Sequence, residues 1–192
     1  MFGNRPHNAK ELNLLDPIDL KILSILQSHG RCHLAEIAKE VDLSSPAVME
    51  RVKKLEAHGV IKGYHAVLDA KKIGKHITAF IGVSVGHQRY INEFASYVVR
   101  QPDVLECHHV TGEESFILKI KTASTLSLEK LLGEIRSVEG VTRTVTRVVL
   151  STPKESQKLE FDERFAAEHL SGRKTSGERE EPKAVAEGSR KK

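Results

Sequence analysis

The sequence has few cysteines, no long apolar run and no motif of a common catalytic site. Its 192 residues include only Cys32 and Cys107, too few for a disulfide framework, which indicates free thiols. No apolar run approaches the roughly 20 residues that cross a bilayer, and residues 1–15 lack the apolar core and cleavage site of a signal peptide. A Gly-rich phosphate loop and a nucleophile motif are missing as well. We therefore expect a cytoplasmic protein without membrane contact, and we name no catalytic residue and no cofactor.

Positive charge is scarce over most of the chain. The formal net charge is +4, but residues 172–192 alone hold seven Lys and Arg against four Glu. The rest of the chain is therefore nearly neutral, and DNA binding has to be argued from motif geometry rather than from total charge. The composition of residues 172–192 predicts a disordered charged tail, and residues 1–13, which show no period, predict a disordered lead-in.

Three consecutive residues, Cys107, His108 and His109, raise the question of a metal site. Strand alternation would place Cys107 and His109 on one side and His108 on the other, so the three cannot converge within one chain. No second Cys or His cluster has ligand spacing. We interpret the three as packing or interface residues and expect no metal.

Residues 14–64 predict three short helices. The sequence Asp16-Pro17-Ile18-Asp19 has the form of a helix start, and a second helix follows with apolar residues from Leu34 to Val41. For the third helix, Ser45 is the expected N-cap, Pro46 the first helical residue and Gly59 the terminator, so it should run from Pro46 to His58. The short connection 42–44 makes a helix-turn-helix unit.

The third helix should bury Val48, Val52 and Leu55 as one stripe. The opposite surface then carries Pro46, Glu50 and Lys53, with Arg51 and Lys54 on a flank. Such a helix can place its N-terminal turn in the DNA major groove while its cations meet phosphates. For Arg51 the alternative is an ion pair with Glu36 or Glu40 inside the helical unit.

The second half predicts a ferredoxin-like βαββαβ domain over residues 77–152. Strand periods are expected at 77–85, 104–110, 115–120 and 141–150, with helical periods at 90–100 and around 128–135. Residues 65–76 should form a linker, and Thr152-Pro153-Lys154-Glu155 has the capping-box form that predicts a last helix over 153–171. Two helices shield only one sheet face, and the strands are largely apolar or Thr-rich on both sides, so a dimer through the other face follows.

The first half contains a spaced series of residues: Leu15-Asp16, Ile18-Asp19, Ile22-Leu23, Leu26-Gln27, Gly30-Arg31, Ala38, Leu43-Ser44, Val48, Arg51-Val52, Leu55-Glu56, Gly59-Val60-Ile61 and Gly63-Tyr64. This pattern resembles the Lrp/AsnC family of transcriptional regulators. The second half resembles the ligand-sensing domain of the family at Val104-Leu105-Glu106-Cys107, Val110-Thr111-Gly112 and Gly140-Val141. The resemblance covers roughly residues 14–154 and implies an α+β protein, with an N-terminal winged helix-turn-helix and a C-terminal RAM/ACT-like sandwich domain.

This resemblance implies a homodimer, often assembled to an octamer, that binds promoter DNA and responds to an amino acid or related metabolite. The DNA-binding residues would be Ser44, Ser45, Pro46, Ala47, Glu50, Arg51 and Lys54. The effector-binding residues would be Thr111, Gly112, Glu114, Ser115, Thr144 and Thr146.

The chain departs from the family pattern at three positions. Asp42 stands where a turn glycine is usual, and Asp tolerates the left-handed conformation better than most residues. His33 replaces a Ser or Thr cap, which should weaken one helix start. Ser115 replaces an acidic residue that would pair with an amino acid's ammonium group, and Glu114 is the candidate to substitute for it.

Two other functions fit the same architecture. The first is a siroheme decarboxylase-like enzyme, in which His108 or His109 would contact the tetrapyrrole. The second is a ligand-sensing assembly whose helical domain no longer reads DNA. The serine-capped, cationic third helix argues against the enzyme, whereas failure of all genomic fragments to bind at low salt would favour the assembly.

Overall fold

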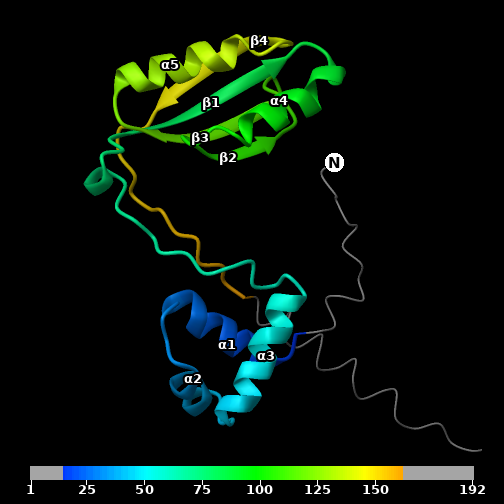
Figure 1. Cartoon of the computed structure of the whole chain (residues 1–192), viewed down its shortest axis with the longest axis vertical. Coiled ribbons are helices and arrows are strands. Elements are labelled where there is room, and N and C mark those ends of the chain that lie inside the picture. The colour runs from blue at the N-terminus through cyan, green and yellow to red at the C-terminus, as the bar shows by residue number, and fades with distance from the viewer. Residues whose placement is uncertain (1–14, 162–192) are drawn as a thin grey trace, which may run out of the picture. The chain divides into compact units, whose positions relative to one another are not determined.

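The computed structural model describes residues 15–161, which fall into two compact units (Figure 1). The helical unit comprises the described residues up to His65 together with residues 156–161, and the sheet unit comprises residues 66–155. The predicted lead-in over 1–13 and the charged tail over 172–192 lie outside the described residues. Within residues 15–161, no helix combines the length and the apolar character needed to span a membrane.

The helical unit contains α1 (Pro17–Ser28), α2 (Leu34–Glu40) and α3 (Ser45–Ala57). At the start of α1 the predicted cap is confirmed: the Asp19 backbone N–H donates to Asp16 Oδ1 at 2.9 Å, and the Asp16 N–H donates to Asp19 Oδ2 at 3.1 Å. The three helices bury one apolar cluster, formed by Ile22, Leu23, Ile37, Ala38, Val41, Val48, Val52 and Leu55. The predicted buried stripe of the third helix is thereby confirmed.

Helix α3 begins one residue earlier than the sequence predicted. Its N-cap is Ser44, whose hydroxyl accepts a hydrogen bond from the Ala47 backbone N–H at 3.4 Å, so Ser45 is helical and Pro46 comes second. Proline costs nothing at the second position either, because the first four N–H groups of a helix have no intrahelical acceptor. The turn before α3 contains Asp42 at a φ of 54°, the left-handed conformation expected for it.

Residues 62–69 form no strand, although their composition is β-prone. A strand needs a hydrogen-bonded neighbour, and the described part of the chain provides none for this stretch. A single 3-10 turn, η2 (Lys71–Ile73), precedes the sheet.

The sheet unit has the predicted βαββαβ order. It consists of β1 (Ile77–Val85), the 3-10 turn η3 (Gln88–Tyr90), α4 (Ile91–Val98), β2 (Val104–His109), β3 (Phe116–Thr122), α5 (Thr125–Arg136) and β4 (Val141–Val148). The strands form one antiparallel sheet in the order β2-β3-β1-β4, in which Ile81 of β1 lies between Leu118 of β3 and Thr146 of β4.

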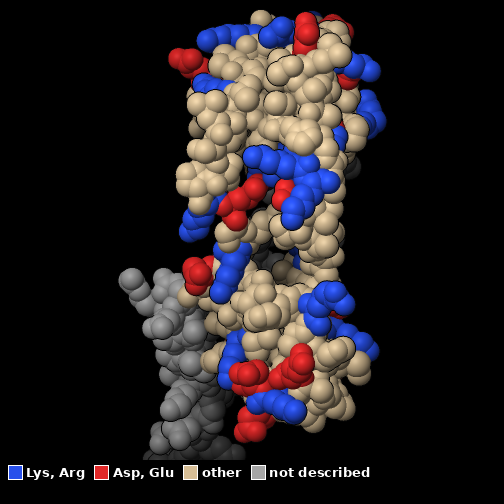
Figure 2. Space-filling model, turned by 90° about the vertical axis from the view of Figure 1, so that its left-hand side faces the viewer, with Lys and Arg blue, Asp and Glu red and all other residues tan. Residues whose placement is uncertain are grey.

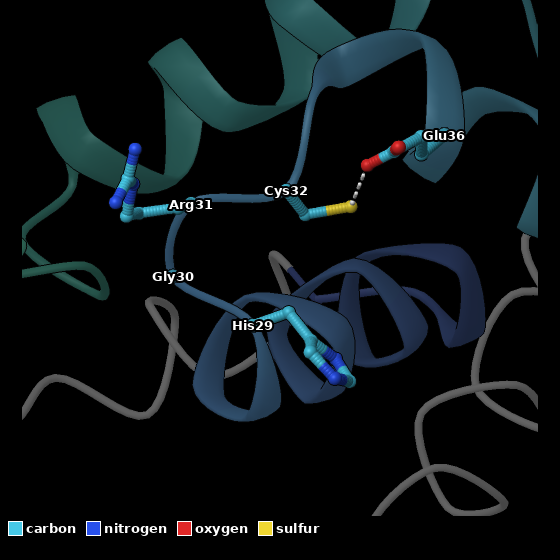
Figure 3. A pocket seen from close by; sticks show the side chains of 5 residues that line it. All are labelled: His29, Gly30, Arg31, Cys32 and Glu36. Carbon is cyan, nitrogen blue, oxygen red and sulfur yellow. Dashed lines mark hydrogen bonds between the residues drawn. The ribbon is translucent and has the colours of Figure 1, made fainter.

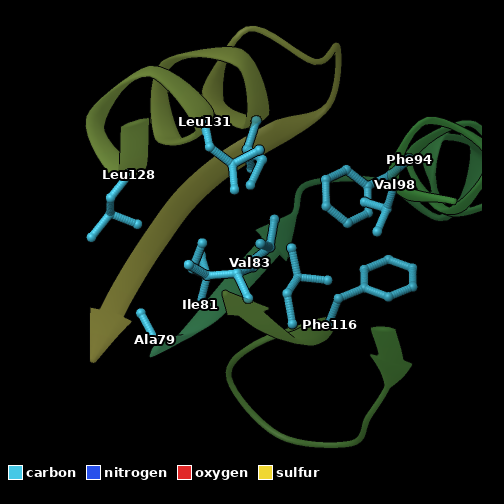
Figure 4. Packing of buried hydrophobic residues seen from close by; sticks show 11 residues of the cluster. Ala79, Ile81, Val83, Phe94, Val98, Phe116, Leu128 and Leu131 are labelled. Atoms are coloured by element: carbon cyan, nitrogen blue, oxygen red, sulfur yellow. The ribbon is translucent and has the colours of Figure 1, made fainter. Parts of the chain in front are cut away.

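Both helices of the sheet unit cover the same sheet face. The alternate residues Ala79, Ile81 and Val83 of β1 point to this face and are fully buried. They pack with residues of the neighbouring strand and of both helices (Figure 4), namely Phe94, Val98, Phe116, Leu118, Ile120, Leu128, Leu131 and Ile135. The second sheet face, here called the open face, is covered by no helix of the described residues.

The open face is less apolar than the sequence suggested. Phe80 and Ile117, on neighbouring strands, are 38 % and 37 % exposed there. The same sides of the strands also carry charged residues, which are Glu106, Lys119, Lys121, Arg143 and Arg147. Lys119 pairs with Glu106 at 3.1 Å and with Glu155 at 3.0 Å. The expectation that the strands are largely apolar or Thr-rich on both sides is therefore wrong for the open face, because it did not separate the two sides of each strand.

The expected helix over 153–171 is absent from the part of it that is described. Residues 151–161 contain no helix, and the remainder of the range lies outside the described residues. The side-chain amide of Gln27 in α1 instead binds the backbone of Leu159: its nitrogen donates to the carbonyl at 3.1 Å, and its oxygen accepts from the N–H at 2.8 Å. Backbone groups bound in this way by another segment do not need a helix to be satisfied.

Candidate DNA-binding surface and effector loop

The exposed surface of α3 is the first candidate site. Because Val48, Val52 and Leu55 face the core, the residues on the opposite side, Pro46, Glu50 and Lys53, are exposed. Of the other predicted contacts, Ser44 and Lys54 are exposed, whereas Ser45 and Ala47 are half-buried. This surface also contains Met49, which is 41 % exposed. Met49 was not among the contacts predicted from the sequence, although its position outside the stripe of Val48, Val52 and Leu55 was the signal for it.

Arg51 serves the helical unit itself. One of its terminal nitrogens, Nη1, lies 2.7 Å from Asp16 Oδ2 and 2.8 Å from Asp19 Oδ1. Hydrogen bonds to Asp16 and Asp19 raise the pKa of Arg51. Burial alone would raise the pKa of Asp16, but the backbone hydrogen bond from Asp19 and the pairing with Arg51 outweigh burial and lower it.

The structure therefore gives Arg51 an intramolecular role that the sequence argument named only as the alternative. The partners are Asp16 and Asp19 at the start of α1, and not Glu36 or Glu40 of α2. We withdraw Arg51 from the proposed phosphate contacts. Its guanidinium group joins the start of α1 to the middle of α3. This link helps to hold α3 in place, with Pro46, Glu50 and Lys53 exposed.

The remaining cations of α3 are exposed. Lys54 lies 3.1 Å from Glu50 one turn away, with side chains 67 % and 71 % exposed, and such a surface pair is weak enough to open for a phosphate. Lys53 has no carboxylate partner among residues 15–161. On the face shown in Figure 2, Lys and Arg side chains lie close to Asp and Glu side chains instead of forming one positive patch. That face therefore carries no broad positive patch.

A shallow hollow lies in the connection between α1 and α2. It is lined by His29, Gly30, Arg31, Cys32 and Glu36 (Figure 3). The Cys32 thiol lies 3.1 Å from Glu36 Oε2, and this hydrogen bond raises the pKa of Cys32, so the thiol stays protonated and is a poor nucleophile. Glu36 Oε2 also accepts from the His33 backbone N–H at 3.1 Å. Glu36 thus caps α2, where the His33 side chain makes no capping hydrogen bond.

The three residues Cys107, His108 and His109 do not come together. In the register of β2, Cys107 lies opposite Leu118 and His109 opposite Phe116, both on the helix-covered side, whereas His108 lies opposite Ile117 on the open face. His108 Nε2 is 3.3 Å from Glu106 Oε2. Within the described residues, no group of three or more His, Cys, Asp or Glu side chains could hold a metal ion.

The loop between β2 and β3 contains four of the predicted effector residues. Gly112 has a φ of 126°, which a residue with a side chain rarely adopts. The Ser115 backbone N–H donates to the Val83 carbonyl at 2.8 Å, and the Ser115 hydroxyl accepts from the Val85 backbone N–H at 3.1 Å. Ser115 therefore extends the pairing of β3 with β1, and its hydroxyl is already engaged.

The predicted effector residues divide between the two sheet faces. On the helix-covered side, Thr144 accepts a hydrogen bond from Arg136 Nε at 2.9 Å, and the buried Thr146 hydroxyl has no partner among the described residues. On the open face, Glu114 Oε1 lies 3.4 Å from Arg147 Nη2. Within one chain, Glu114 and the two threonines therefore do not form one pocket.

Gly82 of β1 determines how Glu114 lies. A Cβ atom at position 82 would be 2.6 Å from Glu114 Cγ, so only glycine lets the Glu114 side chain lie against the strand. A glycine in the middle of a strand is the signal that could have identified this position from the sequence.

Two family models match the chain, and together they span both units. Residues 15–62 match a winged helix-turn-helix DNA-binding domain, and residues 78–159 match the Lrp/AsnC ligand binding domain. The first match covers all three helices of the helical unit, and the second begins in β1 and ends beyond β4.

Curated relatives match over most of their length. The HTH-type transcriptional regulator FL11 of Pyrococcus furiosus is 38 % identical over 146 residues, which is 76 % of this chain and 96 % of the relative. The leucine-responsive regulatory protein of Klebsiella pneumoniae is 35 % identical over 148 residues, 76 % of this chain and 90 % of the relative.

Solved structures agree with this assignment. A transcriptional regulator of Neisseria meningitidis in complex with L-Met is 31 % identical, with a TM-score of 0.73 over 78 % of this chain and 99 % of that one. The leucine response regulatory protein of Mycobacterium tuberculosis is 32 % identical, with a TM-score of 0.69 over 76 % of this chain and 99 % of that one. The chain belongs to the Lrp/AsnC family of transcriptional regulators.

Proposed function

We propose that this regulator binds double-stranded DNA by placing the N-terminal half of α3 in the major groove. The observation that carries the proposal is the exposed surface of α3, with Ser44, Pro46 and Glu50 on it and Lys53 and Lys54 towards its end. Ser44, Pro46 and Glu50 would approach base edges, and Lys53 and Lys54 would contact phosphates. A dimer would then bind two half-sites about one helical turn, or a multiple of it, apart. We propose that the protein acts in the cytoplasm, with the DNA that it would bind.

The test is selection of duplexes from a random library by the purified full-length protein, followed by fluorescence-anisotropy titration at several salt concentrations. Lys53→Ala should weaken binding to every sequence and should reduce the slope of log affinity against log salt by about one, as the loss of one phosphate contact does. Failure to enrich any sequence at low salt would reject DNA reading and favour a ligand-sensing assembly.

We further propose that an amino acid is the effector, bound with its ammonium group at Glu114. The similar structure from Neisseria meningitidis is a complex with L-Met, and residues 78–159 match a ligand binding domain. The Glu114 side chain is 22 % exposed, and its one described cationic partner, Arg147, is 62 % exposed at 3.4 Å, so an ammonium group could replace the guanidinium. Thr111 and Gly112 of the same loop would supply backbone groups, whereas Thr144 and Thr146 could take part only from a second chain.

Isothermal titration with a panel of amino acids tests this site. Glu114→Gln should abolish the heat of binding, because a neutral amide cannot neutralise an ammonium group. Glu113→Gln is the matched control: its carboxylate is 84 % exposed and lies 3.7 Å from Arg143, so its loss should leave binding unchanged. Equal binding by wild type and Glu114→Gln would remove Glu114 from the site.

No observation favours the tetrapyrrole enzyme. Its candidate contacts, His108 and His109, lie on opposite faces of the sheet, and His109 packs against Phe116 with ring centroids 5.0 Å apart. We propose that the protein is not an enzyme, and a Soret band after incubation with a tetrapyrrole would count against this.

A further inference from the structure

The start of α3 lacks the side chains that identify purines by paired hydrogen bonds. Arg and Lys read guanine in the major groove, and Asn and Gln read adenine. Residues 45–49 are Ser-Pro-Ala-Val-Met and include none of these four types. The Ser44 hydroxyl already accepts from the Ala47 backbone N–H. This part of α3 is therefore poorly equipped for hydrogen-bonded readout.

The charged residues that follow are also unsuited to reading guanine. Arg51, the one arginine of α3, is engaged by Asp16 and Asp19 at 2.7 and 2.8 Å on the side that faces α1. Lys53 and Lys54 lie in the second half of the helix, where a helix entering the groove by its N-terminus brings side chains towards the backbone. Apart from Glu50, which can accept a hydrogen bond from cytosine N4, the large exposed side chains left near the bases are apolar.

Met49 is the large apolar side chain at this position. It is 41 % exposed, while its neighbours Val48 and Val52 complete the buried stripe, so the core of the helical unit does not need it. Pro46, one turn earlier, is exposed as well. The apolar group that the major groove displays is the C5-methyl of thymine. A flexible thioether side chain can adapt to this methyl group without a fixed hydrogen-bond geometry.

We propose that α3 recognises its site chiefly through thymine methyl groups, with Met49 as the specificity-determining contact and Pro46 beside it. The inference rests on the proposed docking of α3 in the major groove and adds the chemistry of the base that is read. Selected sites should therefore contain thymine at a fixed position in each half-site.

Deoxyuridine provides the direct test, because it pairs with adenine as thymine does but lacks the methyl group. In a site selected by the full-length protein, each thymine is replaced in turn by deoxyuridine, and affinity is measured by anisotropy. At the position read by Met49, the wild type should lose about fourfold, the change that corresponds to one buried CH₂ group.

Met49→Ala should bind the thymine and deoxyuridine duplexes equally at that position, and its circular dichroism should match that of the wild type. Leu126→Ala, which truncates a 74 % exposed side chain in α5, is the matched control and should keep the fourfold preference. The inference is overturned if no deoxyuridine lowers affinity, or if Met49→Ala keeps the preference. A library that yields no enriched site would instead reject the proposed DNA binding, on which the inference depends.

Discussion

At the residue scale, the guanidinium group of Arg51 in α3 pairs with two carboxylates, Asp16 and Asp19, at the start of α1. Arg51→Ala would leave Asp16 and Asp19 close together without a cation, and we expect it to destabilise the helical unit by about 2 kcal/mol. Amide hydrogen exchange in α1 and α3 measures the change. The salt slope of DNA binding should stay that of the wild type, because no phosphate contact is lost.

Lys53→Ala gives the opposite pair of results and serves as the control. This side chain is exposed on the same helix, so exchange should be unchanged while the salt slope becomes shallower. A shallower slope for Arg51→Ala with unchanged exchange would return Arg51 to the DNA contacts.

The ion pairs of Arg51 with Asp16 and Asp19 also predict that the stability of the helical unit depends on pH in acid. The pKa of Asp16 is lower in the folded chain than its ordinary value of 3.8. The stability that this difference contributes is complete above 3.8 and is lost as the pH falls through the depressed pKa of the folded state. Exchange protection of α1 should therefore fall with acid below this pH. Asp16→Asn should flatten that dependence, and an unchanged pH profile of exchange protection would count against the role given to the Asp16–Arg51 pair.

At the element scale, replacing Gly140 or Gly133 by alanine should change the stability of the sheet unit in opposite directions. Gly140, just before β4, has a φ of 85°, and an added Cβ would lie 2.3 Å from Tyr90 Cγ. Gly140→Ala should destabilise the sheet unit by about 2 kcal/mol or more.

Gly133 lies inside α5, where an added Cβ meets no atom within 4 Å. Gly133→Ala should stabilise the sheet unit by about 0.5–1 kcal/mol, because glycine is entropically costly within a helix. Urea unfolding of both variants measures the two effects, and a loss of stability for Gly133→Ala would show that α5 does not tolerate even a methyl group there.

Elements whose signals are local could be predicted from the sequence. The cap at Asp16, the buried stripe of α3 and the alternation of β1 depend on neighbours a few residues away, and all three match the structure. The partners of Arg51 are more than 30 residues distant, and several carboxylates were equally available in the sequence. The contact of Gln27 with Leu159, in the described part of the helix expected over 153–171, likewise joins residues more than 100 positions apart.

The two candidate sites also differ in how far the sequence predicted them. The exposed surface of α3 followed from helical periodicity, so most of its residues were identified. The position of Glu114 over Gly82 and the engagement of Ser115 by Val85 depend on the register between strands, which no short sequence pattern encodes.

At the scale of the whole molecule, the open face is the surface through which we propose that two chains associate. Phe80 and Ile117 lie there on neighbouring strands, diagonally across the ladder, among charged residues. Phe80→Asp and Ile117→Asp should each weaken the dimer about tenfold or more, because an aspartate would be desolvated in the contact. Sedimentation equilibrium measures the dissociation constant. Leu126→Asp in α5 is the control, and equal weakening by all three would place the contact elsewhere.

The hydrogen bonds between Gln27 and Leu159 have a consequence for the order of events during synthesis. The apolar core of the helical unit is complete in sequence once Ile61 has been made, so α1, α2 and α3 can assemble while the sheet is still being translated. Residues 156–161 leave the ribosome only after β4, so α1 can form before Gln27 meets Leu159. The sheet unit is thus an insertion between two parts of the helical unit, and Gln27 receives its partner after every strand of the sheet has been made.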